Sequence, residues 1–238
     1  MRFRNNLLTE EFFQIIDSFP LNRIIPCHKG KMRYKLPMLF PIALIRAYHK
    51  LTMLYFKLRT PLLAWVWGVQ HGKRLIFQGR TIIRTRQNGE IVLGDMVIFN
   101  AQHSANLVGL TGPSILETLG GGKIIVGDRS GFSSVVISSH SSITIGSRVK
   151  MGGNVRVFDH DYHAHEAEYR CTPEDRKHIR TKPVVIEDDC FIGTNAIILK
   201  GTHLGARTIV AAGSVVFGLD VPADSMVKGN QAEIVERK

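Results

Sequence analysis

The feature that most constrains the fold of this chain is a six-residue period that runs from Val184 to Val216. Six residues advance an α-helix by about 600°, which is not a whole number of turns, and an ordinary strand repeats every two residues. A period of six is typical of short strands separated by sharp corners and wound into a coil around one continuous core. Branched aliphatic residues occupy every sixth position and are expected to point inward: Ile186, Ile192, Ile198, Leu204, Val210 and Val216. Smaller residues stand two positions before each of them: Val184, Cys190, Ala196, Thr202, Thr208 and Ser214.

The same coil is expected to begin well before this stretch. Corners with an aliphatic residue, a glycine and a polar residue recur at 93–95, 126–128 and 145–147. Residues 101–122 break the period and are interpreted as an irregular excursion. Residues 158–182 also lack the period, and they contain four histidines: His160, His163, His165 and His178. Long loops in compact domains are often functional, so this protruding loop is where we expect chemistry.

Three segments resemble the hexapeptide-repeat acyltransferases: 183–193, 211–216 and the close at 220–230, which reads Asp-Val-Pro and later Lys-Gly-Asn. The similarity covers roughly residues 90–235 and is greatest to the maltose, galactoside, capsule and lipopolysaccharide O-acetyltransferases. The resemblance implies a mainly β fold, a left-handed parallel β-helix of triangular section. It also implies a homotrimer that transfers an acetyl group directly from acetyl-CoA to a sugar or surface-glycan hydroxyl, with no metal.

Two domains are predicted: a basic helical flank over residues 1–70 and the β-helix over 71–238, with a closing segment at 217–238. Helices are expected at 9–19 and 41–59, since each has a plausible first turn and an apolar face. Arg46, Lys50 and Lys57 fall within about 40° of one another on the second helix. Two interpretations of this basic helix stay open: it lies on an anionic membrane surface, or it packs on the β-helix.

Composition indicates the charge, the compartment and the absence of membrane-spanning segments expected of this protein. The net charge is +11, from 31 Lys and Arg against 20 Asp and Glu, and the excess is concentrated in the first 60 residues. Three irregularly spaced cysteines form neither a disulfide framework nor a zinc motif, which favours a reducing, cytoplasmic compartment. The longest uncharged apolar run is far shorter than the ~20 residues of a spanning helix, so no transmembrane segment is predicted. The first residues also lack the apolar core of a signal peptide.

The resemblance assigns the general base to the loop. His163, Glu166 and Arg170 repeat the family spacing of the catalytic histidine, an acid three residues later and an arginine seven residues later. His163 is therefore expected to be the base, with Asp161 or a nearby carbonyl fixing its tautomer and Arg170 contacting substrate. His160 is the alternative base. An unperturbed histidine pKa of about 6.5 suits this role.

The acceptor and cofactor residues follow from the same resemblance. Ser133 stands where the family has an oxyanion or acceptor-orienting asparagine, and Ser134 lies beside it. His140 falls near the family's acceptor-binding acid, so the acceptor of this chain can differ from those of the family. Coenzyme A lies between subunits in the family, which places it here on Gly193, Thr194, Ala212, Gly213 and Lys228.

Three other functions are alternatives to the acetyltransferase. The run 159–165 is rich in zinc-ligand residue types, which would suit a γ-carbonic-anhydrase-like enzyme on the same fold. A nucleotidyltransferase would need a glycine-rich nucleotide-binding unit, and residues 1–70 hold none. A non-catalytic scaffold that binds nucleic acid through the basic flank would need no histidine loop, and the flank has no recognised binding motif.

Overall fold

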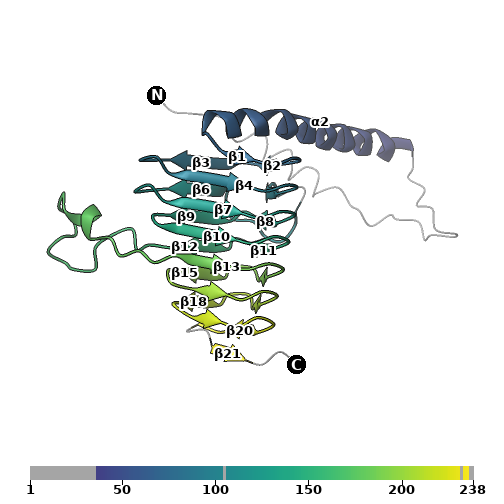
Figure 1. The fold of residues 1–238 in the computed structure, drawn as a ribbon. Coiled ribbons are helices and arrows are strands. Elements are labelled where there is room, and N and C mark those ends of the chain that lie inside the picture. Colours follow the sequence, from purple (N-terminus) through teal and green to yellow (C-terminus); the bar gives the residue numbers. More distant parts are fainter. Residues whose placement is uncertain (1–35, 104–105, 231–232, 236–238) are drawn as a thin grey trace. The chain divides into compact units, whose positions relative to one another are not determined.

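The structure, a computed structural model, describes residues 36–103, 106–230 and 233–235 (Figure 1). The chain divides into two compact units, Met1–Leu51 and Thr52–Lys238, and each is described by itself. The helix predicted at 9–19 lies outside the described residues. The domain boundary predicted at residue 70 stays a prediction.

The helix predicted at 41–59 is longer than expected and runs over Leu36–Val66 (α2). Its last part belongs to the second unit and packs on the first coil of the β-helix. There Thr60 Oγ1 accepts a hydrogen bond from the Phe77 backbone N–H at 3.0 Å, and Ala64 is completely buried. Among the described residues, no helix is both long enough and apolar enough to cross a membrane.

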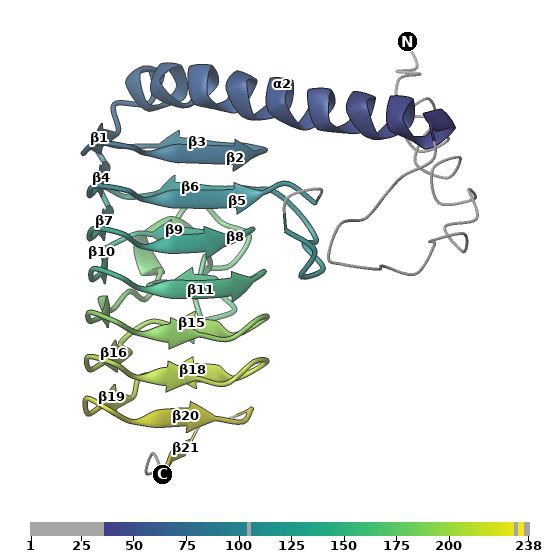
Figure 2. The same cartoon turned by 90° about the vertical axis from the view of Figure 1, so that its right-hand side faces the viewer.

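The rest of the second unit is a coil of short strands that form three sheets (Figures 1 and 2). Sheet A contains β1 (Gln70–His71), β4 (Glu90–Leu93), β7 (Lys123–Val126), β10 (Ser142–Ile145), β13 (Val184–Ile186), β16 (His203–Leu204) and β19 (Asp220–Val221). Sheet B contains β2 (Ile76–Gly79), β5 (Ile98–Ala101), β8 (Gly131–Ser133), β11 (Lys150–Gly153), β14 (Phe191–Ile192), β17 (Ile209–Val210), β20 (Met226–Lys228) and β21 (Glu233–Val235). Sheet C contains β3 (Thr81–Thr85), β6 (Ser114–Thr118), β9 (Val136–Ser139), β12 (Arg156–Phe158), β15 (Ile197–Leu199) and β18 (Val215–Phe217).

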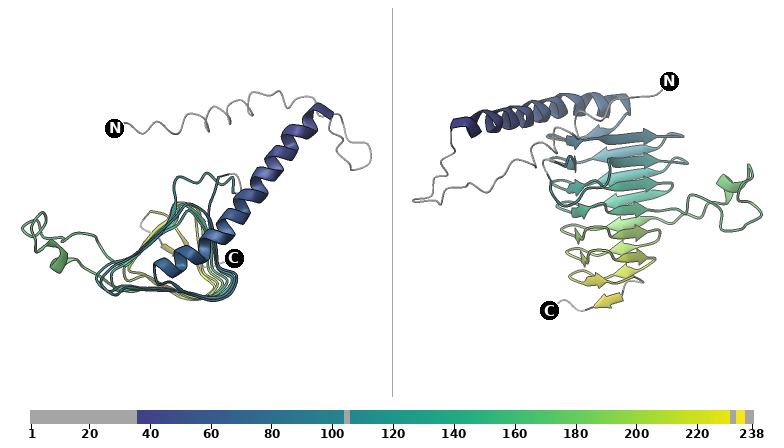
Figure 3. Two further views of the ribbon diagram at one scale, coloured as in Figure 1. Left: turned by 90° about the horizontal axis from the view of Figure 1, so that it is seen from above. Right: turned by 180° about the vertical axis from the view of Figure 1, so that it is seen from behind.

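The strand order confirms a parallel β-helix. Successive strands pass from sheet A to B to C, and each pairs in parallel with the strand one coil away, apart from the antiparallel pair β20–β21. Seen along the coil, the three sheets enclose a triangular section (Figure 3). The inward register predicted from the six-residue period is also confirmed, since all six of its aliphatic residues are fully buried: Ile186, Ile192, Ile198, Leu204, Val210 and Val216.

The excursion predicted at 101–122 is only partly irregular. Residues 114–118 form strand β6 in sheet C, paired with β3 and β9. Its inward residues are Ser114, Leu116 and Thr118, all buried. Because two of the three are polar, this strand lacks the aliphatic signal on which the sequence interpretation depended.

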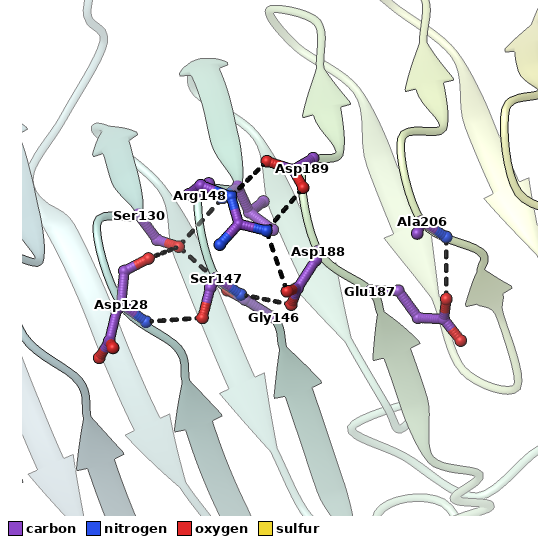
Figure 4. Close-up of polar contacts among 10 residues, drawn as sticks. Asp128, Ser130, Gly146, Ser147, Arg148, Glu187, Asp188, Asp189 and Ala206 are labelled. Atoms are coloured by element: carbon purple, nitrogen blue, oxygen red, sulfur yellow. Dashed lines mark hydrogen bonds and ion pairs between the residues drawn. The ribbon is translucent and has the colours of Figure 1, made fainter.

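The corner between sheets A and B is held by a ladder of hydrogen bonds that runs from coil to coil (Figure 4). The backbone N–H of Asp128 donates to Ser147 Oγ at 3.1 Å, and the N–H of Ser147 donates to Asp188 Oδ1 at 2.8 Å. Arg148 binds the carboxylate of Asp189 through two nitrogen atoms, at 2.6 and 2.7 Å. These contacts satisfy corner N–H groups outside the strand ladders and fix the spacing of the coils.

Candidate functional site

The loop 158–182 leaves sheet C after β12 and projects from the coil before β13 begins (Figures 1 and 3). The loop contains one short 3-10 helix, Asp175–His178. This confirms the long non-repeating loop that the sequence predicts. All of the loop histidines and the candidate base residues lie on it or at its start.

His163 is hydrogen-bonded to an aspartate that the sequence analysis did not identify. Its Nδ1 lies 2.7 Å from Asp175 Oδ2, while Asp175 Oδ1 accepts the Ala164 backbone N–H at 2.6 Å. These two hydrogen bonds, that of Ala164 first, lower the pKa of Asp175, so its carboxylate is ionised near neutral pH. A carboxylate only accepts hydrogen bonds, so His163 carries its proton on Nδ1. The His163 side chain is 70% exposed, which leaves Nε2 as a proton acceptor that a substrate can reach.

The assignment of Asp161 as the partner of His163 is therefore corrected. Asp161 instead forms ion pairs with Lys200 and with His165, whose Nε2 lies 2.7 Å from Asp161 Oδ2. Lys200 comes from the coil below and also lies 4.9 Å from the centre of the Phe217 ring. Asp161 thus ties the base of the loop to the β-helix, and Asp175 takes the predicted role of fixing the tautomer.

Glu166 and Arg170, the other members of the family spacing, cross-link the loop. Arg170 donates to the His165 carbonyl oxygen at 3.0 Å. Glu166 pairs with Arg180, and this contact lowers the pKa of Glu166. Arg170 is exposed, so a role in binding substrate stays a prediction.

His160 has surroundings quite different from those of His163, because it is only 3% exposed. Its Nδ1 accepts the backbone N–H of Tyr162 at 3.1 Å, and its Nε2 lies 3.1 Å from Ser138 Oγ. The Ser138 hydroxyl donates to Glu117 Oε2 at 3.3 Å. Burial lowers the pKa of His160, which favours the neutral ring. Since both nitrogens already have partners, His160 has no lone pair free for a substrate proton in this conformation.

His140 is partly buried and lies beside His160. The two ring centres are 5.8 Å apart. The fully buried Asp159 holds the adjoining corner, because it accepts bonds from Ser139 Oγ and from the backbone N–H groups of His140 and Ser141, at 2.7 to 2.9 Å. The structure therefore brings His140 next to the alternative base, His160.

The remaining predicted residues gather at the corner between sheets B and C. Ser133 Oγ accepts a bond from Asn106 at 2.8 Å, and Ser134 is buried and donates to the Gly112 carbonyl at 2.7 Å. The predicted cofactor residues stack on successive coils of this corner: Gly193, Thr194, Ala212, Gly213 and Lys228. Direct contacts join them, since the Gly213 N–H donates to the Thr194 carbonyl at 2.9 Å. We call these five residues the cofactor column.

The serines and the cofactor column are separated from His163 by the full width of sheet C. Strand β9 connects the Ser134 corner with the His140 corner, and six extended residues span about 20 Å. One copy of the chain therefore does not bring the predicted cofactor residues to the predicted base. A centre that combines them needs the loop of one copy and the corner of another.

Sequence reasoning missed Asp175, Ser138 and Glu117. No sequence signal marks Asp175, because it lies twelve positions after His163 along an irregular loop. Glu117, Ser138 and Phe158 are aligned by the parallel register of β6, β9 and β12, so a correct prediction of β6 could have found the first two. Among the residues the structure describes, no group of three or more His, Cys, Asp or Glu side chains forms a metal-binding cluster.

Comparison with known proteins agrees with the fold. Residues 183–217 match the family described as the hexapeptide repeat of succinyl-transferase. The 2,3,4,5-tetrahydropyridine-2,6-dicarboxylate N-acetyltransferase of Staphylococcus aureus is 49% identical over 55 residues, which is 23% of either chain. The match thus spans about a quarter of that relative.

Two solved structures are also similar. The N-acyltransferase AntD from Bacillus cereus, in complex with dTDP and 3-hydroxybutyryl-CoA, has a TM-score of 0.55 at 14% identity, over 74% of this chain and 87% of its own. The hexapeptide-repeat acetyltransferase VCA0836 of Vibrio cholerae, in complex with acetyl-CoA, is 35% identical over 50% of this chain and 62% of its own, with a TM-score of 0.42. Residues 183–217 thus resemble hexapeptide repeats, and the observed coil agrees with the predicted left-handed β-helix.

Proposed function

We propose that this protein is an acetyltransferase that moves an acetyl group from acetyl-CoA to a hydroxyl of a sugar or surface glycan. The observation that carries this proposal is the pair His163–Asp175, whose Nδ1 and Oδ2 atoms lie 2.7 Å apart on an exposed loop. An aspartate that orients a histidine in this way leaves Nε2 ready to accept a proton. The 55-residue similarity to an N-acetyltransferase supports acetyl as the group transferred.

The chemistry needs few groups. As the acceptor oxygen attacks the thioester carbonyl, His163 Nε2 takes the hydroxyl proton, and Asp175 stabilises the imidazolium that forms. Collapse of the tetrahedral intermediate breaks the carbon–sulfur bond, and the imidazolium returns the proton to the coenzyme A sulfur. No acyl-enzyme is formed, so Cys171, an exposed free thiol, has no part in the reaction.

The cofactor column is proposed to bind coenzyme A in a homotrimer. Because His163 and the column lie at opposite edges of sheet C, a complete site would combine the loop of one copy with the column of its neighbour. Ser133 would then lie beside the donor, with its hydroxyl available to the oxyanion. The free thiols of Cys171 and Cys190 fit a reducing, cytoplasmic compartment, which is part of the same proposal.

His160 is the competing base, because its lowered pKa keeps it neutral and its Nε2 begins a relay through Ser138 to Glu117. To act as the general base, the His160 ring would have to break one of its two hydrogen bonds. His163 needs no such change, which is why the proposal places the base there.

The proposed function is tested by incubating the purified protein with acetyl-CoA and a panel of mono- and oligosaccharides, followed by mass spectrometry of the products. An added mass of one acetyl group on a sugar, dependent on the enzyme, is expected. Cys171→Ser should retain most of the rate, whereas a covalent route would abolish it. Acetyl transfer to amines alone would replace the hydroxyl acceptor, and no transfer to any acceptor would contradict the proposal.

The shared site is tested by mixing two inactive variants. His163→Ala removes the base, and Ala212→Trp fills the exposed surface of the cofactor column. If each site uses one residue from each of two copies, random mixed oligomers should recover about a quarter of the wild-type rate. Mixtures without activity would show that each site is built within one chain.

A further inference from the structure

The outward face of α2 is apolar along much of its length. Large side chains at spacings of three and four residues lie on one side of the helix, and each is more than half exposed. These residues are Leu51 (66%), Leu54 (54%), Tyr55 (57%), Leu58 (67%), Leu62 (58%) and Trp65 (79%). We call them the apolar stripe. Contiguous exposed apolar surface of this kind marks an interaction site.

The opposite face of the same helical segment is the one that packs on the β-helix. Thr60 is buried and hydrogen-bonded to Phe77, and Ala64 is fully buried. Residues 52–66 lie over the first coil (Figure 2). Their exposed large side chains are on the side of the helix opposite Thr60 and Ala64. The core of the β-helix does not account for the stripe.

Neither α2 nor the first coil of the β-helix contains an acidic residue. The sequence contains no acidic residue between Asp17 and Glu90. On α2 the charged residues are Arg46, Lys50, Lys57 and Arg59, and the first coil below adds Lys73, Arg74, Arg80, Arg84 and Arg86. Apart from Arg84, which pairs with Glu117, the cations of this coil have no ion pair among the described residues. An apolar surface edged by lysine and arginine complements a bilayer with anionic head groups.

A second copy of the helix is a less favourable occupant. The spacing of Leu51, Tyr55, Leu58, Leu62 and Trp65 would suit a helix pair, but such pairs use opposite charges along their edges. Two copies of α2 would bring only cations together, because the segment has no carboxylate.

We propose that the apolar stripe of α2 docks this protein on the surface of an anionic membrane. The helix lies in the plane of the interface, with leucine and tryptophan side chains among the acyl chains and the surrounding cations at the head groups. This proposal does not depend on acetyl transfer, and the stripe and the loop 158–182 are separate parts of the chain. If both proposals hold, the acceptor would be met at a membrane surface.

Tryptophan fluorescence reports on the stripe directly, because the chain has two tryptophans, Trp65 and Trp67, and both lie at the end of α2. We would add the full-length protein to vesicles of phosphatidylcholine alone and to vesicles with about 30% phosphatidylglycerol. Binding is measured by co-sedimentation, and insertion by the blue shift and by quenching with brominated lipid. The test variant is Leu58→Ser/Leu62→Ser. The control is Ile125→Ser, an exposed residue on the third strand of sheet A.

The wild-type protein and Ile125→Ser are expected to bind anionic vesicles and to show the blue shift, and Trp65→Phe should lose most of it. The double variant should bind at least about tenfold more weakly, and added salt should weaken the wild type. Circular dichroism and sedimentation establish that the double variant is folded and unchanged in mass. Absence of wild-type binding to anionic vesicles would overturn the proposal, as would equal binding by the double variant. A smaller assembly in the double variant, without vesicle binding by the wild type, would assign the stripe to a second copy instead.

Discussion

His163 and Asp175 meet across the protruding loop, with Nδ1 and Oδ2 2.7 Å apart. The same aspartate accepts the backbone N–H of Ala164, so it is fixed with respect to the residue that follows His163. The ring of His163 therefore has a defined orientation although its side chain is 70% exposed. A histidine held in this way is suited to proton transfer. Replacement of Asp175 tests whether the reaction depends on it.

Asp175→Asn should lower kcat by about 10²–10⁴, because the amide can no longer hold the Nδ1–H tautomer or stabilise the imidazolium. The KM for acetyl-CoA should change little, since the cofactor column is elsewhere. Glu174→Gln is the matched control. It replaces a carboxylate by an amide at the neighbouring residue, but Glu174 pairs with Lys177 and not with His163. Equal rates for the two variants would remove Asp175 from the mechanism.

The six-residue register predicts opposite effects for two neighbouring residues of β15. Ile198 is fully buried, so Ile198→Asp places an unpaired charge in the core and should cost several kcal/mol of unfolding free energy, on the order of 4. Ile197 lies on the outer side of the same strand and is partly exposed, so Ile197→Asp should cost much less. Urea unfolding of both variants is the measurement, and similar midpoints would show that the register is wrong.

Two glycines of the cofactor column should respond differently to alanine. A Cβ on Gly193 would lie 2.4 Å from the Ala212 backbone nitrogen, whereas a Cβ on Gly213 meets nothing within 4 Å. Gly213 has a φ of +72°, so Gly213→Ala should cost only about 1 kcal/mol of backbone strain. Gly193→Ala should lower the melting temperature more. The opposite order would contradict the close approach of these two coils.

His203 should make stability depend on pH. Its Nε2 lies 3.0 Å from Glu187 and its Nδ1 lies 2.7 Å from Asp220, and these two carboxylates, Glu187 first, raise the pKa of His203. A raised pKa means that the folded state binds the proton more tightly than the unfolded state. The stabilisation is therefore complete below the unfolded value of about 6.5 and is lost as pH rises through the folded value.

His203→Gln should thus lower the free energy of unfolding by no more than about 1 kcal/mol near pH 6, because solvent screens the exposed ring. Near pH 9 the loss should be almost zero. Urea unfolding at the two pH values gives this difference, with His103→Gln, also exposed, as the control. A cost that is the same at both pH values would show that the two carboxylates do not hold a protonated ring.

Much of the fold could be predicted because the six-residue period records the core directly. Ile186 through Val216 are buried where the period places them, since one aliphatic side chain per strand must fill the narrow interior. The period fails at β6, where Ser114 and Thr118 point inward. The period also carries no information on the length of α2, because a helix does not repeat every six residues.

The candidate site was less predictable, because irregular loops carry no period. The spacing of His163, Glu166 and Arg170 predicts a site on the long loop, but the groups that contact these residues are Asp175, the His165 carbonyl and Arg180. His160 and His163 are three residues apart and indistinguishable in sequence. The structure separates them by exposure, because His160 is only 3% exposed whereas the His163 side chain is 70% exposed.

The most direct test of the account is the rate of acetyl transfer by His163→Ala and His160→Ala, each compared with the wild type across the pH range of histidine ionisation. We expect His163→Ala to lose about 10²–10⁴ in kcat and the rising limb of the pH profile, while it keeps its fold and its affinity for coenzyme A. His160→Ala should lose stability, because a buried cluster is opened, and should retain a larger share of its rate. A fully active His163→Ala beside a folded but inactive His160→Ala would contradict the account and move the base three residues back.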